Sequence, residues 1–109
     1  MSDEVGAVFA ALADPTRRMV VESLLREGST SVPALTAGLP ISRQAVAKHL
    51  AALEDARLLE RLPGPGREVR YRLRGEALGP ARAWLTNAES AWEGRLGRLK
   101  RAVEAGPEK

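Results

Sequence analysis

Apolar side chains recur with helical spacing at the start of the chain. Four of them fall at positions i, i+3, i+4 and i+7, namely Val5, Val8, Phe9 and Leu12. This spacing places them on one face and predicts an amphipathic helix. Asp14 and Pro15 should end this helix and begin the next, because Asp is a preferred N-cap and Pro is favoured at the first helical position.

A second helix is predicted from Pro15 to about Glu27. Gly28 follows it and suits the left-handed position that commonly ends a helix. The residues expected to face the core are Val20, Val21, Leu24 and Leu25.

Two shorter helices should follow, each capped by a serine. Ser31 precedes a helix expected over 32–37, the segment Gly38-Leu39-Pro40 stops it, and Ser42 caps the next one. Two short helices joined by a glycine-containing turn form a helix-turn-helix pattern.

The second of these helices has two unlike faces. Its apolar side consists of Val46, Leu50 and Leu53. Gln44 and Lys48 lie nearly opposite, with the small residues Ala47 and Ala51 between them, so the backbone could approach DNA closely. The alternative is an ordinary surface helix whose alanines serve helix propensity.

A hairpin should follow. Residues 58–62 are expected to form a strand, and Pro63-Gly64-Pro65-Gly66 a turn. Residues 67–74 then alternate, which predicts a second strand. Its inward positions are Val69, Tyr71 and Leu73, and its outward positions are Glu68, Arg70, Arg72 and Arg74. A basic hairpin after a helix-turn-helix is typical of the wing of a winged helix.

The last helix is predicted from about residue 76 to 104. Its apolar stripe comprises Leu78, Leu85, Trp92, Leu96, Leu99 and Val103, and the last four are spaced 4, 3 and 4. Such a seam favours helix–helix packing. A small domain cannot easily bury this helix and the first one, so we expect a homodimer through Val5, Val8, Phe9, Leu12, Trp92, Leu96, Leu99 and Val103. The alternative is that both helices pack on the protomer's own core.

Composition narrows the class of protein. A chain of 109 residues with 44% hydrophobic and 28% charged residues fits one globular domain over 1–109. No apolar run approaches the ~20 residues that span a bilayer, and the acidic start is unlike a secretory signal, so we expect a cytoplasmic protein without membrane partners. The chain has no cysteine, which excludes disulfides and thiolate metal sites.

Charge is distributed unevenly. Residues 42–74 hold 8 basic and 4 acidic residues, a net of +4, whereas residues 1–41 hold 3 basic and 5 acidic, a net of −2. The excess therefore falls on the helix and hairpin that could enter a groove of DNA. A solvated surface is the alternative explanation for the charge alone.

Taken together, these motifs resemble the ArsR/SmtB-type winged-helix repressors of bacteria. The matching segments are Leu12-Ala13-Asp14-Pro15-Thr16-Arg17-Arg18, Ile41-Ser42 through Ala45-Val46 and His49-Leu50 to Leu53, and Arg67-Glu68-Val69-Arg70-Tyr71-Arg72-Leu73. The resemblance implies a mainly α fold with a β-hairpin wing, in the order α-α-α-α-β-β-α. It also implies a dimer that binds an operator and is released by an effector.

The chain departs from this family in two places. Family members often have Gly in an Ala-Gly-Leu sequence after the recognition helix, where this chain has Ala56-Arg57-Leu58. A left-handed Arg57 would cost about 1 kcal/mol relative to Gly, so we expect the turn to differ slightly. The residues that hold metals in metal-sensing members are also missing, so we expect neither a metal nor a cofactor.

We therefore predict a homodimeric regulator of transcription that binds a pseudo-palindromic DNA operator and acts as a repressor. The expected DNA contacts are Ser42, Arg43, Gln44, Lys48 and His49 in the helix and Arg67, Arg70 and Arg72 in the wing. For Arg17 and Arg18, a backbone contact to DNA and a structural role are equally supported. Release would come from an organic effector, from a partner protein, or from no effector at all.

The sequence gives less support to two other classes of protein. A winged-helix module that binds protein without specific DNA binding would use the helix of Trp84 and Trp92, but the basic wing argues against it. An enzyme has little support, because the chain has no cysteine, one histidine and no phosphate-binding glycine loop.

Overall fold

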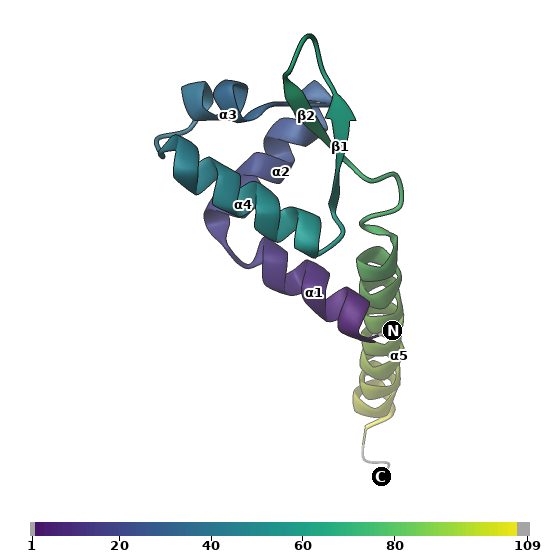
Figure 1. Ribbon diagram of the computed structural model, residues 1–109. Helices are drawn as coiled ribbons and strands as arrows, with labels where there is room; N and C mark the ends of the chain where they lie inside the picture. Colours follow the sequence, from purple (N-terminus) through teal and green to yellow (C-terminus); the bar gives the residue numbers. More distant parts are fainter. Residues whose placement is uncertain (1, 107–109) are drawn as a thin grey trace.

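The computed structural model describes residues 2–106 and contains five helices and one hairpin in that range (Figure 1). In chain order these are α1 (Ser2–Leu12), α2 (Pro15–Glu27), α3 (Val32–Gly38), α4 (Arg43–Asp55), β1 (Leu59–Pro63), β2 (Val69–Leu73) and α5 (Gly79–Ala105). The predicted fold class and order of elements are confirmed. Within the described part of the chain, no helix is both long and apolar enough to cross a membrane.

Helices α2, α3 and α4 begin where capping side chains place them. Asp14 Oδ1 accepts hydrogen bonds from the backbone N–H of Thr16 and Arg17, at 2.7 and 3.2 Å. Ser31 and Ser42 cap α3 and α4 in the same way, through the backbone N–H three residues on. Gly28 ends α2 with a φ of 86°, a conformation that an L residue rarely adopts.

The core lies between α1, α2, α4 and the hairpin. Its largest fully buried side chains include Val8, Val20, Val46, Leu50, Leu53 and Leu58. The predicted inward faces of α2 and α4 are confirmed except at Leu25, which is 63% exposed. Leu25 lies one position around the helix from the buried Leu24, and its side of α2 borders an open groove.

The hairpin pairs β1 and β2 antiparallel, with Leu59 opposite Leu73 and Pro63 opposite Val69. The middle of β2 is bound to the α2–α3 loop, because Thr30 and Tyr71 exchange two backbone hydrogen bonds, at 2.8 and 3.0 Å. Tyr71 is buried as predicted, but the prediction for Val69 is wrong, since this side chain is 42% exposed. Val69 pairs with Pro63 at the end of the ladder nearest the turn.

The turn between α4 and β1 keeps the geometry that glycine would favour. Arg57 has a φ of 64°, so our expectation of a different turn is wrong. Its backbone N–H bonds the Glu54 carbonyl at 2.8 Å, and the Leu58 N–H bonds the Leu53 carbonyl at 2.9 Å. These bonds satisfy carbonyls at the end of α4, which accounts for the arginine's backbone conformation.

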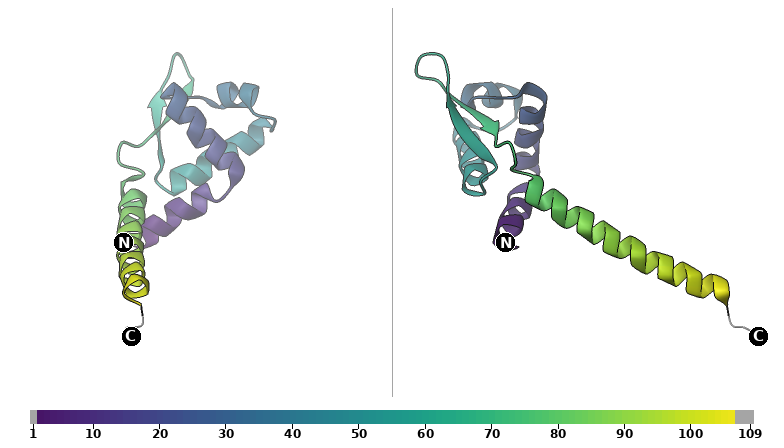
Figure 2. Two further views of the ribbon diagram at one scale, coloured as in Figure 1. Left: turned by 180° about the vertical axis from the view of Figure 1, so that it is seen from behind. Right: turned by 90° about the vertical axis from the view of Figure 1, so that its right-hand side faces the viewer.

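The last helix starts later than predicted and leaves the rest of the fold. Backbone hydrogen bonds from Ala77 to Arg74 and from Gly79 to Glu76 form turns, and α5 begins only at Gly79. Near its start, α5 packs on α1, where Phe9 and Trp84 meet edge to face with ring centroids 5.7 Å apart. Further along, α5 projects away from the other elements (Figure 2).

Candidate nucleic-acid interface

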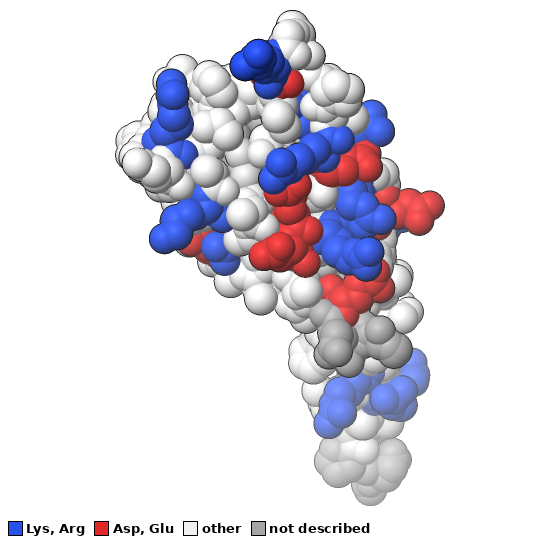
Figure 3. Space-filling model, viewed as in Figure 1, with Lys and Arg blue, Asp and Glu red and all other residues white. Residues whose placement is uncertain are grey.

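The outward face of α4 carries the predicted reading residues. Ser42, Arg43, Gln44 and Lys48 are all exposed, while Val46 and Leu50 anchor the opposite face in the core. Figure 3 shows basic side chains over the N-terminal half of α4 and the tip of the hairpin, with acidic ones toward the C-terminal end of α4. The helix therefore presents its N-terminal half, rather than its whole length, as a surface for an anionic partner.

His49 lies on a different side of α4. Its side chain is half-buried, and it is close enough to Asp14 for its charge to act on that carboxyl group. The pKa of Asp14 is lowered chiefly by the hydrogen bond from the Arg17 backbone N–H; partial burial opposes this, and the Thr16 N–H, His49 and the Arg17 side chain lower it further. Helical spacing thus places His49 next to the buried Leu53, on a different side of α4 from Gln44 and Lys48.

The three predicted wing arginines have different surroundings. Arg67 is exposed in the turn. Arg72 is exposed too, and its Nε lies 2.6 Å from Glu60 Oε2 on the neighbouring strand. Such an exposed pair contributes little to stability, so Arg72 would lose little by leaving Glu60.

Arg70 is half-buried and joins the wing to the loop between α2 and α3, although it lies on the strand face opposite the buried Tyr71, as predicted. Its Nε donates to Ser29 Oγ at 3.0 Å, its Nη2 to the Ser29 carbonyl at 3.1 Å, and its Nη1 to Glu68 at 3.4 Å. Sequence reasoning missed this role because Ser29 is 41 residues away in the chain.

Arg17 and Arg18 have a structural role at the end of α1. Arg17 Nε donates to the Ala11 carbonyl and Arg18 Nη1 to the Leu12 carbonyl, both at 2.7 Å. These are among the last carbonyls of α1, which have no partner within the helix. The two arginines therefore cap α1 from the first turn of α2.

A shallow pocket of about 560 Å³ opens on the same side of α4 as the predicted reading residues Arg43 and Gln44. It is lined by Val32 at the start of α3 and by Arg43, Gln44 and Ala47 of α4. Sequence reasoning missed Val32, because the sequence identifies it only as the first residue of a short helix. Its proximity to α4 depends on how the two helices cross.

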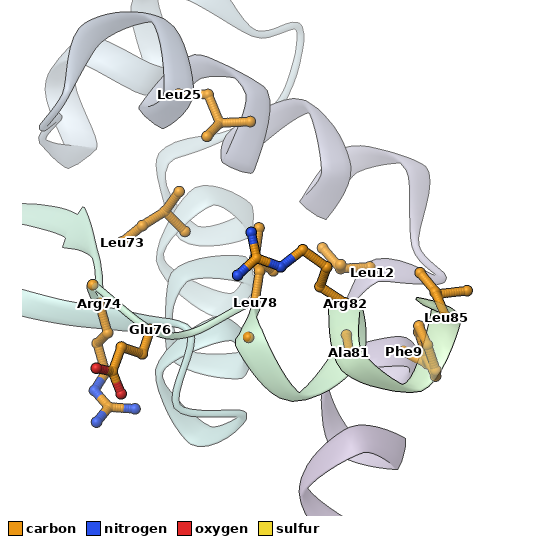
Figure 4. Close-up of a pocket in the computed structure, with 12 residues that line it drawn as sticks. Phe9, Leu12, Leu25, Leu73, Arg74, Glu76, Leu78, Ala81, Arg82 and Leu85 are labelled. Atoms are coloured by element: carbon orange, nitrogen blue, oxygen red, sulfur yellow. The ribbon is translucent and has the colours of Figure 1, made fainter. Parts of the chain in front are cut away.

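A larger groove of about 710 Å³ lies between α1, α2, the β2–α5 connection and α5. Its apolar lining includes Phe9, Leu12, Leu25, Leu73, Leu78 and Leu85. In Figure 4 the Arg82 side chain extends across the groove, and Arg74 and Glu76 line it on the side of the β2–α5 connection. Among residues 2–106, no group of three or more His, Asp or Glu side chains is placed to hold a metal ion.

The fold and this surface define a winged helix-turn-helix protein, and the comparisons with known proteins agree. Residues 12–61 match the model of a helix-turn-helix domain family. The structure of an ArsR-like transcriptional regulator from Rhodococcus sp. RHA1 superposes with a TM-score of 0.78 at 40% identity, covering 93% of each chain.

Two relatives identified by sequence are regulators as well. The HTH-type transcriptional regulator Rv2034 of Mycobacterium tuberculosis is 43% identical over 77 residues, 71% of this chain and 70% of its own length. The HTH-type transcriptional regulator YuzN of Bacillus subtilis is 40% identical over 65 residues, 54% of this chain and 71% of its own length. The chain belongs to the ArsR family of winged helix-turn-helix transcriptional regulators.

Family membership decides among the classes of function. The protein is a DNA-binding transcriptional regulator, and its family is one of regulators, not of enzymes. The alternative of an interaction module without specific DNA binding loses its support, because the relatives are regulators of transcription.

Proposed function

We propose that the protein is a homodimeric repressor that binds a pseudo-palindromic operator. The observation that carries this proposal is the exposed stripe on the distal part of α5. Its side chains Trp92, Leu96, Leu99 and Val103 are between 42% and 71% exposed. Apolar residues at this spacing stabilise a helix when a second helix covers them, and a second copy of α5 has the matching stripe.

The first helix adds the rest of the proposed interface. Phe9 is exposed and already touches Trp84 of α5, while Val5 and Leu12 are half-buried. Val8 is buried in the protomer's own core, so we leave it out of the proposed contacts between copies. The dimer interface would thus extend from α1 along α5.

A two-fold dimer presents two copies of α4 and two wings. Ser42, Arg43, Gln44 and Lys48 would contact base edges and nearby phosphates in the major groove, with Gln44 suited to adenine. Arg67 and Arg72 would contact phosphates and set the position of the protein on the duplex. We leave out His49 and Arg70, because both are half-buried and face other parts of the chain.

The groove beside α1 and α5 would receive an organic effector. Its walls are apolar, and the Arg82 guanidinium across it favours a molecule with an anionic group. A molecule bound here touches both α5 and the winged body, so it would change the distance between the two reading helices. That change would release the operator.

The experiment that tests the DNA proposal is selection of bound sequences from a random duplex library, followed by footprinting. Two inverted half-sites, separated centre to centre by roughly one helical turn or a small multiple of it, are the expected result. Recovery of a single unrepeated half-site, or of no preferred sequence, would contradict the proposal. Transcription in vitro from a promoter that overlaps the selected site should fall when the protein is added.

A further inference from the structure

The shallow pocket between α3 and α4 is lined by two apolar and two polar side chains. Val32 is half-buried at the first position of α3, and Ala47 is exposed on α4. Arg43 and Gln44 complete the lining. Because Gln44 and Ala47 are three residues apart in one helix, they are neighbours on its surface. An apolar surface therefore lies next to the amide that we expect to contact adenine.

Among the four bases of DNA, thymine alone presents a methyl group in the major groove, at C5. The hydrogen-bond donors and acceptors exposed there would find no partner on the side chains of Val32 and Ala47. A pocket lined by a valine, an alanine and two hydrogen-bonding side chains thus matches a thymine, whose methyl group adjoins the acceptor O4.

We propose that Val32 and Ala47 form a methyl pocket that selects a thymine in each half-site. The thymine would occupy the same base pair as the adenine read by Gln44, or the adjacent one. Val32 then becomes a specificity residue contributed by α3 rather than by the recognition helix. This inference rests on the proposed operator binding, and it adds a base preference that hydrogen bonding by Gln44 alone would not produce.

The first test changes the DNA and leaves the protein intact. In the duplex obtained by selection, each thymine is replaced in turn by deoxyuridine, which pairs with adenine but lacks the methyl group. We expect one thymine in each half-site at which the dissociation constant rises about fourfold, the ratio for burying one methyl-sized apolar group. Equal affinity for the two bases at every thymine would overturn the inference.

The second test changes the pocket. Val32→Thr keeps the shape of the side chain but adds a hydroxyl, and Ala47→Ser adds one at an exposed position where folding is not at risk. At the thymine that proves sensitive to uracil in the first test, each variant should bind the thymine duplex and the uracil duplex almost equally, so the ratio of the two affinities should be close to one. Val69→Thr is the matched control, since it makes the same change in the wing and should leave the ratio unaltered.

The ratio of affinities for the thymine and uracil duplexes distinguishes an effect on base recognition from an effect on folding. If Val32 served stability alone, Val32→Thr would weaken binding to both duplexes equally and the ratio would persist, which would contradict the proposal. A cytosine at the sensitive position should bind weakly, and 5-methylcytosine there should recover about the same fourfold factor. Failure of 5-methylcytosine to bind better than cytosine would count against the pocket.

The outcomes also separate this inference from the function on which it rests. If selection gives an inverted repeat but no thymine is sensitive to uracil, the proposed operator binding stands and the methyl pocket is wrong. If selection gives no preferred sequence, both are wrong.

Discussion

Arg74 donates a hydrogen bond through Nη1 to the main-chain carbonyl of Arg57, across 2.9 Å. The two residues flank the hairpin, with Arg57 just before β1 and Arg74 just after β2. Among the described residues other than glycine, Arg57 alone has a positive φ. The contact thus closes the base of the wing on a residue whose backbone conformation is itself unfavourable for an L-amino acid.

Replacing Arg57 with glycine should stabilise the protein. The left-handed conformation costs an L residue roughly 1–2 kcal/mol, and the extra freedom of an unfolded glycine offsets part of the gain. We expect Arg57→Gly to raise the free energy of unfolding by up to about 1 kcal/mol in urea titrations. Arg57→Ala is the control, because it removes the side chain but keeps the strained backbone. An equal gain in both variants would show that the φ angle is not the cause.

The N-cap of α2 should make stability depend on pH at the acid end. The folded-state pKa of Asp14 is lowered, first by the Arg17 backbone N–H, so its stabilising contribution is complete above the unfolded-state value of about 3.9. The contribution disappears as the pH falls through the lowered folded-state pKa. Asp14→Asn caps without titrating. The stability difference between wild type and this variant should therefore shrink below about pH 4, as measured by thermal unfolding, and a constant difference would refute the assignment.

Charges on the stripe of α5 should dissociate the dimer. Leu96→Glu with Leu99→Glu places two carboxylates in the proposed apolar seam, and sedimentation should show monomers at tens of micromolar, where wild type is dimeric. Ser90→Glu with Gly94→Glu is the matched control, since it adds the same charge on the opposite, exposed side of α5. A wild-type protein that sediments as a monomer would contradict the proposal.

Helix and wing should differ in what they contribute to DNA binding. Gln44→Ala should cost about 1–3 kcal/mol at one or two base positions and relax the preference there. Arg67→Ala or Arg72→Ala should weaken binding to every duplex and lower the salt slope by about one unit. Arg70→Ala should instead destabilise the fold, because it removes the bonds to Ser29. Measuring affinity over a series of salt concentrations and base-substituted duplexes distinguishes these effects. If Gln44→Ala weakened binding to all sequences alike while the wing substitutions changed the base preference, this division of roles would be refuted.

Metal ions should not release the operator. The chain has no cysteine and one histidine, and among the described residues no group of three or more His, Asp or Glu side chains is placed to hold a metal ion. Zn²⁺, Cd²⁺, Ni²⁺ and arsenite should therefore leave the protein–operator complex intact in fluorescence-anisotropy titrations. Dissociation at micromolar free metal, with ions bound to the dimer, would contradict this prediction and direct attention to Asp14, Glu89 and Glu93.

Local signals in the sequence predict most of this fold. The caps at Asp14, Ser31 and Ser42 involve residues two or three positions apart, so a short segment of sequence is enough to predict each one. Periodicity also identifies the inward face of α4. It fails at Leu25 and Val69, because a repeating pattern shows which residues share a face but not where the neighbouring element stops covering it.

Part of the candidate site could likewise be predicted from local spacing, and part depends on tertiary packing. The exposed face of α4 follows from helical spacing, since Gln44 and Lys48 lie opposite the buried Val46 and Leu50. The bond between Arg70 and Ser29 and the approach of Val32 to α4 depend on how distant segments pack. Neither has a local signature, and both change which residues are available to DNA.

The projecting end of α5 has a consequence for gene dosage. In the proposed dimer, the stripe from Trp92 to Val103 is covered only when two chains meet, so assembly depends on protein concentration by mass action. A cell that holds the regulator below its dimer dissociation constant would leave most operators empty. The number of copies per cell would then act as a threshold, and weakening the α5 seam would raise that threshold without altering any residue that touches DNA.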